Sequence, residues 1–190
     1  QPYDLSVIEG LGSEDDLRQL ISTAHSCDLK IIADVVFNHM ANLDGGEDFE
    51  DLSKYPNLTP EDFHTNLSNV GARPCSINYS DGNRDSEMNC WLGGLPDLKF
   101  TDNVKTIQKA HLRLLLDLGV DGFRFDSAKH MPTNVLNEYI NYINQQSRGN
   151  AWNYLEVFND DDTIGEDYSW VAAVSDFVLY NDMKEIFTQD

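Results

Sequence analysis

Residues 31–39 read IIADVVFNH, a nearly unbroken run of β-branched and apolar side chains that ends in Asn38 and His39. A run of this kind is typical of a strand that is covered on both faces, so we predict a buried strand at 31–37. The residues before it repeat at the spacing of an amphipathic helix, which we expect at 13–26. A helix followed by a buried strand indicates an α/β fold.

Helix and strand patterns alternate again in the second half of the chain. The expected elements are a helix at 102–117, a strand at 120–126, a helix at 133–146, and strands at 152–158 and 174–180 before a final helical stretch. Gly119 is placed to end the first of these helices, and Thr133 to cap the second. Strands that alternate with helices predict a parallel sheet.

The stretch between these two regions has a different character. Residues 40–100 contain scattered Gly, Asn, Ser, Asp and Pro without a sustained period. Loops in compact domains rarely exceed about 15 residues, so we predict a small inserted subdomain here. Cys75 and Cys90 lie in this subdomain, where a disulfide bridge suits an exported protein. Cys27 ends the first helix, and we expect it to be a small buried apolar residue.

The net charge of the chain limits the kinds of molecule that it could bind. The chain of 190 residues has 13 basic and 33 acidic side chains, a net charge of −20. This charge repels polyanions, so nucleic acid and anionic membranes are poor candidates, whereas a neutral polysaccharide meets no such repulsion. No run approaches the roughly 18 apolar residues that a membrane-spanning helix needs.

Charged side chains gather where the predicted strands end. In GFRFD, residues 122–126, strand alternation sends Arg124 and Asp126 to one side and the two phenylalanines to the other. A guanidinium beside a carboxylate favours its ionised form, which suits a nucleophile; a structural ion pair is the alternative. Glu156 ends the next strand, and the carboxyl ends of parallel barrel strands meet on one face. Two carboxylates about 5–5.5 Å apart there suit a retaining glycosidase.

Four segments resemble sequence signatures of the alpha-amylase family, in that family's order. They are DVVFNH at 34–39, LPDL at 95–98, GFRFDSAKH at 122–130 and the strand-end Glu156. The resemblance covers nearly the whole chain and implies an α/β fold, a partial (β/α)8 TIM barrel of about strands 3 to 6, with an irregular small domain inserted after strand 3. The implied division is barrel at 1–39, a calcium-linked inserted domain at 40–100, and barrel again at 101–190.

The resemblance also implies roles for individual residues. Asp126 is the expected nucleophile and Glu156 the expected acid/base, with Arg124 holding Asp126 ionised. His39, Lys129 and His130 are expected to contact the substrate. Calcium, which prefers oxygen ligands, is the expected metal. Its expected ligands are Asn38, Asp97 and the main-chain carbonyl of His130.

The activity that the resemblance implies is retaining endo-hydrolysis of α-1,4-glucosidic bonds in starch-like glucans, by a secreted enzyme. Two alternatives stay open. One is a related α-glucosidase or transglycosylase of the same family. The other is a non-catalytic barrel that binds carbohydrate or serves as a partner subunit, although such barrels commonly lose the carboxylates that this sequence retains.

The sequence supplies only part of the expected barrel. Neither the first two nor the last two strands have a counterpart in it, and no segment matches the signature that carries the third catalytic carboxylate. Half a barrel leaves sheet edges and apolar helix faces uncovered. We therefore expect an internal segment of a longer enzyme, or a chain that needs a complementary chain to supply the remainder of the barrel. By itself, the chain is expected to be inactive.

Overall fold

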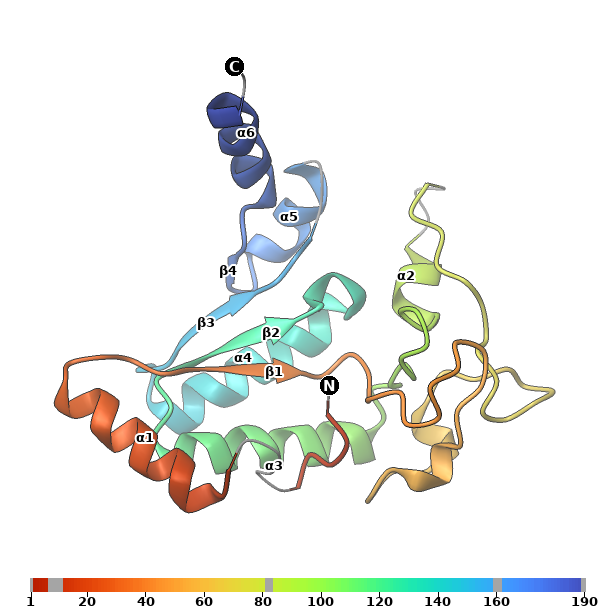
Figure 1. The fold of residues 1–190 in the computed structure, drawn as a ribbon, viewed down its shortest axis with the longest axis horizontal. Coiled ribbons are helices and arrows are strands. Elements are labelled where there is room, and N and C mark those ends of the chain that lie inside the picture. The colour runs from red at the N-terminus through yellow and green to blue at the C-terminus, as the bar shows by residue number, and fades with distance from the viewer. Residues whose placement is uncertain (1, 7–11, 81–83, 159–161, 189–190) are drawn as a thin grey trace.

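The computed structural model describes residues 2–6, 12–80, 84–158 and 162–188, and its centre is one parallel sheet (Figure 1). The strands follow the order β1-β2-β3-β4. Their bounds are Ile32–Val36 for β1, Gly122–Asp126 for β2, Trp152–Leu155 for β3 and Ala173–Val174 for β4. Each strand pairs with the next in parallel and is joined to it through a helix, the repeating unit of a (β/α)8 barrel. The sheet is therefore part of such a barrel, as the sequence predicts.

Local signals explain where the helices begin and end. The principal helices are α1 at Glu14–Ser26, α3 at Asp102–Leu118, α4 at Thr133–Ser147, α5 at Asp162–Ser169 and α6 at Phe177–Thr188. Ser13 caps α1 through a capping box with Asp16, which satisfies two main-chain donors of the first turn. Gly119 ends α3 in the left-handed region with φ 106°, which favours glycine.

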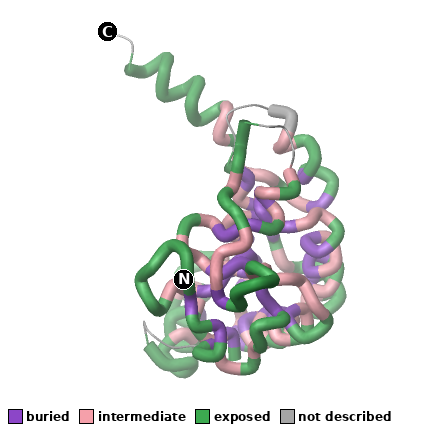
Figure 2. The backbone as a smooth tube through the Cα atoms, turned by 90° about the vertical axis from the view of Figure 1, so that its right-hand side faces the viewer, coloured by how far each residue is buried: buried purple, intermediate pink, exposed green. Residues whose placement is uncertain are grey.

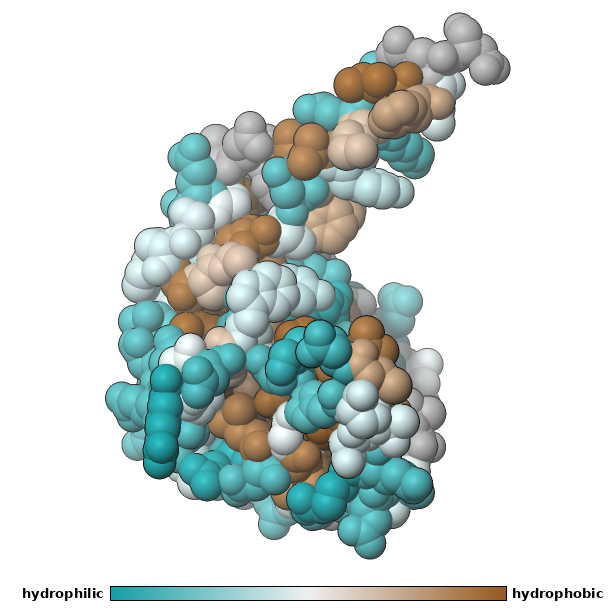
Figure 3. Space-filling view, turned by 90° about the vertical axis from the view of Figure 1, so that its left-hand side faces the viewer, coloured by the Kyte–Doolittle hydropathy of each residue, from teal (hydrophilic) through white to brown (hydrophobic). Residues whose placement is uncertain are grey.

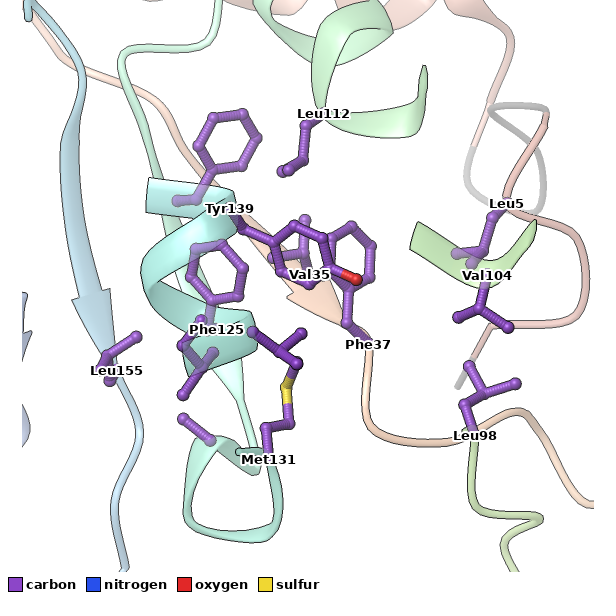
Figure 4. Packing of buried hydrophobic residues seen from close by; sticks show 14 of the residues in the cluster. Leu5, Val35, Phe37, Leu98, Val104, Leu112, Phe125, Met131, Tyr139 and Leu155 are labelled. Carbon is purple, nitrogen blue, oxygen red and sulfur yellow. The ribbon is translucent and has the colours of Figure 1, made fainter. Parts of the chain in front are cut away.

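The core lies between the sheet and helices α3 and α4. The side chains of Phe123 and Phe125, on β2, are fully buried on this face. The ring of Phe125 is parallel to that of Tyr139 from α4, at 6.4 Å between centroids (Figure 4). Buried apolar area of this kind is the main contribution to folding stability. The buried residues of α4 recur at the spacing of one helix face: Val135, Leu136, Tyr139, Ile140 and Ile143.

The other face of the sheet is open in the described part of the chain. Asp34, in the middle of β1, has a side chain that is 58% exposed. The expectation that residues 31–37 are covered on both faces is therefore wrong for this structure, because only the face toward α3 and α4 is packed. Strands of a complete barrel are covered on both faces, which accounts for the apolar run in the sequence.

Gly122 allows β2 and β3 to approach closely. A Cβ atom at this position would lie 1.7 Å from the main-chain oxygen of Trp152. Any side chain larger than hydrogen would therefore push the two strands apart. This position fixes the spacing of β2 and β3, which carry the charged residues at the strand ends.

Residues 40–100 form an irregular segment beside the carboxyl ends of β1 and β2 (Figure 1). It contains two short 3-10 helices, Leu52–Lys54 and Pro60–Asp62, and the short helix α2 at Asp85–Asn89. The predicted disulfide between Cys75 and Cys90 is present. Trp91 is buried and its indole N–H donates to the carbonyl of His64 at 2.6 Å. The buried residues of the segment, Trp91 among them, belong to the same hydrophobic cluster as those of the barrel, and the disulfide adds a covalent cross-link.

The strand predicted at 174–180 is wrong. Only Ala173 and Val174 pair as β4, and α6 starts at Phe177. Asp176 precedes this helix, and its carboxylate accepts a hydrogen bond from the N–H of Leu179 at 2.8 Å. An aspartate that accepts from the N–H three residues on is an N-cap, so the short apolar run after it is helical.

Three further expectations differ from the structure. Helix α5 lies between β3 and β4, where no helix was expected. Thr133 is not the cap of α4; the cap position is Pro132, which makes no side-chain cap hydrogen bond. Cys27 is a free and exposed cysteine at the C-cap of α1, a helix in which Ile21 is the buried residue.

Helix α6 extends away from the rest of the structure. Figure 2 shows it as an exposed arm that ends near the C-terminus, and Figure 3 shows apolar side chains along it. Leu179, Met183, Ile186 and Phe187 are among its exposed residues. Within the described residues, no helix is both long and apolar enough to cross a membrane.

Candidate active site

The polar residues at the strand ends lie on one rim of the sheet. In the parallel register, Val36 pairs with Asp126, and Phe125 pairs with Leu155. The N–H of Glu156 donates to the carbonyl of Phe125 at 2.9 Å, so the pairing of β2 and β3 continues one residue beyond β3. This bond brings Glu156 level with Asp126 on the neighbouring strand. The sequence prediction that these two carboxylates share one edge is consistent with this geometry.

Arg124 holds three carboxylates together. Its Nη1 donates to Asp34 at 2.6 Å and to Asp126 at 3.0 Å, and its Nη2 lies 2.5 Å from Glu156. Asp126 and Glu156 are therefore kept within the span of one guanidinium group. Burial lowers the pKa of Arg124, but the hydrogen bond and charge of Asp34 and the charge of Glu156 raise it by more, so the arginine stays protonated.

Ser127 connects the same two carboxylates on the other side. Its hydroxyl donates to Asp126 Oδ2 at 3.0 Å, and its main-chain N–H donates to Glu156 Oε2 at 3.1 Å. Its φ of 50° places it in the left-handed region, which costs a non-glycine residue backbone energy. The turn after β2 thus takes a strained conformation that directs an N–H toward Glu156.

A cavity of about 460 Å³ opens beside Glu156. Its lining combines polar groups from the turn after β2 with apolar and aromatic side chains. The lining residues are Tyr79, Leu92, Ser127, Lys129, His130, Glu156 and Phe158. A concave site with a few convergent polar groups among apolar side chains is the usual form of a small-molecule site. Lys129 and His130, both predicted to contact substrate, line this cavity.

The two predicted histidines are buried and neutral. Burial lowers the pKa of His39 to about 4; the charge of Asp126 opposes this shift and His130 adds to it. Burial also lowers the pKa of His130, against the effect of the Glu87 carbonyl, which lies 2.9 Å from His130 Nδ1. Both rings are therefore uncharged near neutral pH and are suited to hydrogen bonds with neutral hydroxyl groups.

Asn38 and Asp97 form a second, deeply buried polar pair. The amide of Asn38 donates to Asp97 Oδ1 at 3.0 Å, and His64 Nδ1 lies 2.6 Å from Asp97 Oδ2. Burial raises the pKa of Asp97 to about 7, although His64 and Asn38 both oppose the shift. The predicted pair is thus brought together from the end of β1 and the end of the 40–100 segment, and His64 joins it.

Comparison with known proteins decides the family. The sequence model of the family described as "Alpha amylase, catalytic domain" matches residues 3–180, which is most of the chain. The chain belongs to the alpha-amylase family. Membership confirms the resemblance of the four signature segments, and with it the partial barrel.

Individual relatives of this amylase-family chain agree with the assignment. An alpha-amylase of Streptomyces violaceus is 32% identical over 192 residues, which cover 98% of this chain and 32% of the relative. The structure of an alpha-amylase from Malbranchea cinnamomea superposes with a TM-score of 0.77 at 25% identity, covering 94% of this chain and 36% of that one. The alpha-amylase I of Eisenia fetida in complex with maltohexaose has a TM-score of 0.75 at 27% identity, covering 92% and 38%. This chain therefore spans about a third of the length of these relatives.

The donor set at Asn38 and Asp97 of this amylase-family chain fits a hard cation. Asn38 Oδ1 is buried and accepts no hydrogen bond from any described residue, so an oxygen lone pair is available there. Both side chains are 1% exposed. Carboxylate, amide and carbonyl oxygens suit calcium.

Several residues of the site had no assigned role in the sequence analysis. Asp34 contacts Arg124, and Ser127 contacts both strand-end carboxylates. Strand alternation places Asp34 on the side of Arg124, so the period of two was a usable signal. Tyr79 lines the cavity from an irregular stretch, where no periodic pattern indicates which way a side chain points. Phe158 was expected at the end of a strand at 152–158, but β3 ends at Leu155, so strand alternation does not determine its direction.

Proposed function

We propose that this chain forms part of the catalytic domain of an alpha-amylase that hydrolyses internal α-1,4-glucosidic bonds of starch-like glucans with retention at the anomeric carbon. The observation that carries the proposal is the shared contact of Asp126 and Glu156 with one guanidinium, that of Arg124, at the rim of the sheet. Family membership supports the hydrolase class. The cavity beside Glu156 offers room for a sugar ring.

In this reaction, Asp126 attacks the anomeric carbon and forms a glycosyl ester as the glycosidic bond breaks. Glu156 gives its proton to the departing oxygen, and then takes a proton from the water that hydrolyses the ester. The second displacement restores the original configuration and returns Glu156 to its acid form. Arg124 supplies a permanent positive charge beside the attacking carboxylate.

Arg124 alone does not determine which of the two carboxylates is the nucleophile and which is the acid. Arg124 contacts both, so its charge does not by itself distinguish a nucleophile from an acid. Their surroundings do differ, because Glu156 lines the cavity together with Leu92 and Phe158. This position beside the cavity, where the oxygen of a departing sugar would lie, supports Glu156 as the acid.

The remaining groups of the site would bind sugar hydroxyls. His39 and His130 are buried and neutral, and Lys129 stands at the cavity with its Nζ 4.7 Å from the centre of the Tyr79 ring. A neutral polysaccharide is also the partner class that the net charge of −20 tolerates. We expect Lys129→Met to weaken glucan binding more than it slows the cleavage of the glycosidic bond.

Calcium is part of the proposal. Asn38, Asp97 and the main-chain carbonyl of His130 would hold it, and its charge would tie the 40–100 segment to the barrel. The buried Asn38 oxygen without a hydrogen-bond donor among the described residues supports this assignment. The division of the chain at residues 39 and 100 stays a prediction that goes with it.

The proposal also includes a partner that completes the barrel. The open face of the four-stranded sheet supports the proposal that a remainder of the barrel, from flanking sequence or a complementary chain, completes the site. The chain alone is then expected to be inactive.

The Cys75–Cys90 disulfide supports an extracellular location, since such bridges persist in oxidising compartments.

The stereochemistry of the product tests the proposed function. A maltooligosaccharide is incubated with a preparation in which the chain and the remainder of its barrel are present, and the first products are followed by proton NMR. Retention predicts the α-anomer first. An initial β-anomer would mean inversion, and would exclude the covalent step at Asp126.

A further inference from the structure

The turn after β2, residues 127–131, carries two cavity residues, and its main chain is held by side chains from distant segments. Arg84 Nη2 donates to the carbonyl of Lys129. The hydroxyl of Tyr168, on α5, lies 2.9 Å from the carbonyl of Lys129 and 3.1 Å from that of Met131, so both carbonyls share its single proton. These two carbonyls flank His130 on either side. The 40–100 segment and α5 thus meet at one short turn.

Arg84 and Tyr168 also hold each other. Arg84 Nη2 donates to the Tyr168 hydroxyl at 2.8 Å, and its guanidinium carbon lies 5.2 Å from the centre of the Tyr168 ring. Tyr168 is fully buried. A hydrogen-bond network that includes a charge and is shielded from water is stronger than its members would be on the surface. The buried tyrosine thus binds a partly exposed arginine both through its hydroxyl and through its ring.

The side chains of the turn are oriented by other groups. His130 Nδ1 lies 2.9 Å from the carbonyl of Glu87, and Lys129 Nζ lies 3.9 Å from the Glu87 carboxylate. Lys129 and His130 line the cavity beside Glu156, whereas Arg84 and Tyr168 do not. Arg84 Nε also lies 3.8 Å from the Glu87 carboxylate, so the contacts that hold the main chain of the turn are linked to those that orient its side chains.

We propose that Arg84 and Tyr168 are positioning residues, which fix the main chain of 127–131 so that Lys129 and His130 are presented to a glucan unit bound beside Glu156. The inference rests on the proposed function for the ligand, and on the contacts of Arg84 and Tyr168 with the turn for the positioning. Neither residue touches the reacting atoms. If the pair is lost, the turn gains freedom, and sugar binding has to reorder it at a cost in affinity.

Hydrogen exchange and sugar binding, measured on the longest form of the protein that carries residues 1–190, test this inference separately. Tyr168→Phe removes only the hydroxyl, and Arg84→Met removes the guanidinium while Arg84→Lys retains a donor. Tyr142→Phe is the matched control, because Tyr142 is a partly buried tyrosine on α4 away from the turn. Amide exchange at 127–131 is expected to be about fivefold faster in Tyr168→Phe, as the loss of one hydrogen bond predicts. Exchange of the β2 amides is expected to stay as in the native chain.

Binding is measured by titration with maltoheptaose. The dissociation constant is expected to rise about threefold or more in Tyr168→Phe and Arg84→Met, with partial recovery in Arg84→Lys. Unchanged exchange at 127–131 in Tyr168→Phe would overturn the positioning role. Equal acceleration at 127–131 and in β2 would also overturn it, because the pair would then serve only global stability. If the native protein with the remainder of its barrel present does not bind maltoheptaose, the proposed function loses its support, while the exchange result still decides the role of the pair.

Discussion

The main-chain N–H of Glu156 donates to the carbonyl oxygen of Phe125 at 2.9 Å. Because this bond lies one step beyond the last residue of β3, it extends the parallel register to the strand ends and sets Glu156 beside Asp126. Arg124 then reaches both carboxylates with separate nitrogens. The position of the proposed acid/base is therefore determined by the main chain of the sheet, whereas its side chain is oriented by the guanidinium and by Ser127.

Gly122 is expected to be intolerant of any side chain. A Cβ there would meet the Trp152 carbonyl at 1.7 Å, so Gly122→Ala has to separate β2 from β3. We expect a loss of at least about 3 kcal/mol in unfolding free energy, measured by denaturant titration. Gly46→Ala is the control, since its added Cβ would lie 3.6 Å from the nearest atom. Similar stability of the two variants would contradict the close approach of the strands.

The acid sensitivity of the fold is expected to depend on Asp121. Burial raises its pKa, but the N–H of Ile31 and the side chains of His25 and Lys30 lower it to about 2 overall. The pKa of an aspartate in the unfolded state is about 3.9. A carboxylate whose pKa is lower than this in the folded state stabilises the fold at pH values above about 3.9, and this contribution is lost as the pH falls toward 2. Asp121→Asn is expected to lower the unfolding free energy by about 2 kcal/mol at pH 7 and to flatten its decline between pH 5 and 2.

Asp117→Asn is the matched control for this titration. Asp117 is 56% exposed and pairs with Arg113 on the surface of α3, and surface pairs contribute little. Its substitution is expected to leave the pH profile of stability unchanged. A profile of Asp121→Asn that is parallel to the native one at every pH would show that Asp121 does not titrate as inferred.

The Cys75–Cys90 bridge is expected to stabilise the 40–100 segment. It closes a loop with a sequence separation of 15, for which the chain-entropy estimate is about 3 kcal/mol. Replacing both cysteines with serine should lower the unfolding free energy by about this amount, and a reducing agent should have the same effect on the native chain. Cys27→Ser serves as the control, because that thiol is free and exposed. A double variant as stable as Cys27→Ser would refute a stabilising role for the bridge.

Calcium is expected to raise the melting temperature, and a chelator to lower it. At a calcium concentration 100 times its dissociation constant, the gain is about 2.7 kcal/mol, which corresponds to several degrees. Asp97→Asn should lose this response. Asp62→Asn removes another buried carboxylate, one that accepts from Thr101 and Asn103, and should keep the response despite lower stability. Equal melting temperatures with calcium and with chelator would remove the metal from the proposal.

Much of the fold was predictable because the signals are local. The capping box of Ser13 and the left-handed Gly119 set the ends of α1 and α3, and the apolar stripe of α4 identified its buried face. The period of two in β2 correctly separated Arg124 and Asp126 from the buried phenylalanines. Charged residues at the ends of successive strands then met on one rim, since parallel strands align their carboxyl ends.

The predictions that were wrong, or that could not be made, also have physical explanations. The apolar run at 174–180 is too short to distinguish strand from helix, and the Asp176 cap decided the outcome. Helix α5 contains Gly165, which weakens a helical pattern, and its anchor Tyr168 is held by contacts with a distant turn. The contact of Arg124 with Glu156 depends on the pairing of β2 with β3, which no local pattern specifies.

The central claim is that Asp126 and Glu156 act together at one rim to cleave a glucosidic bond. Starch hydrolysis, followed by iodine staining and by the release of reducing ends, tests it most directly in the longest form of the protein that carries residues 1–190. Asp126→Asn keeps the size and the hydrogen-bonding shape of the side chain but removes the attacking charge, and the account predicts a loss of several orders of magnitude in kcat with the fold intact. Hydrolysis at the native rate by Asp126→Asn would contradict the assignment.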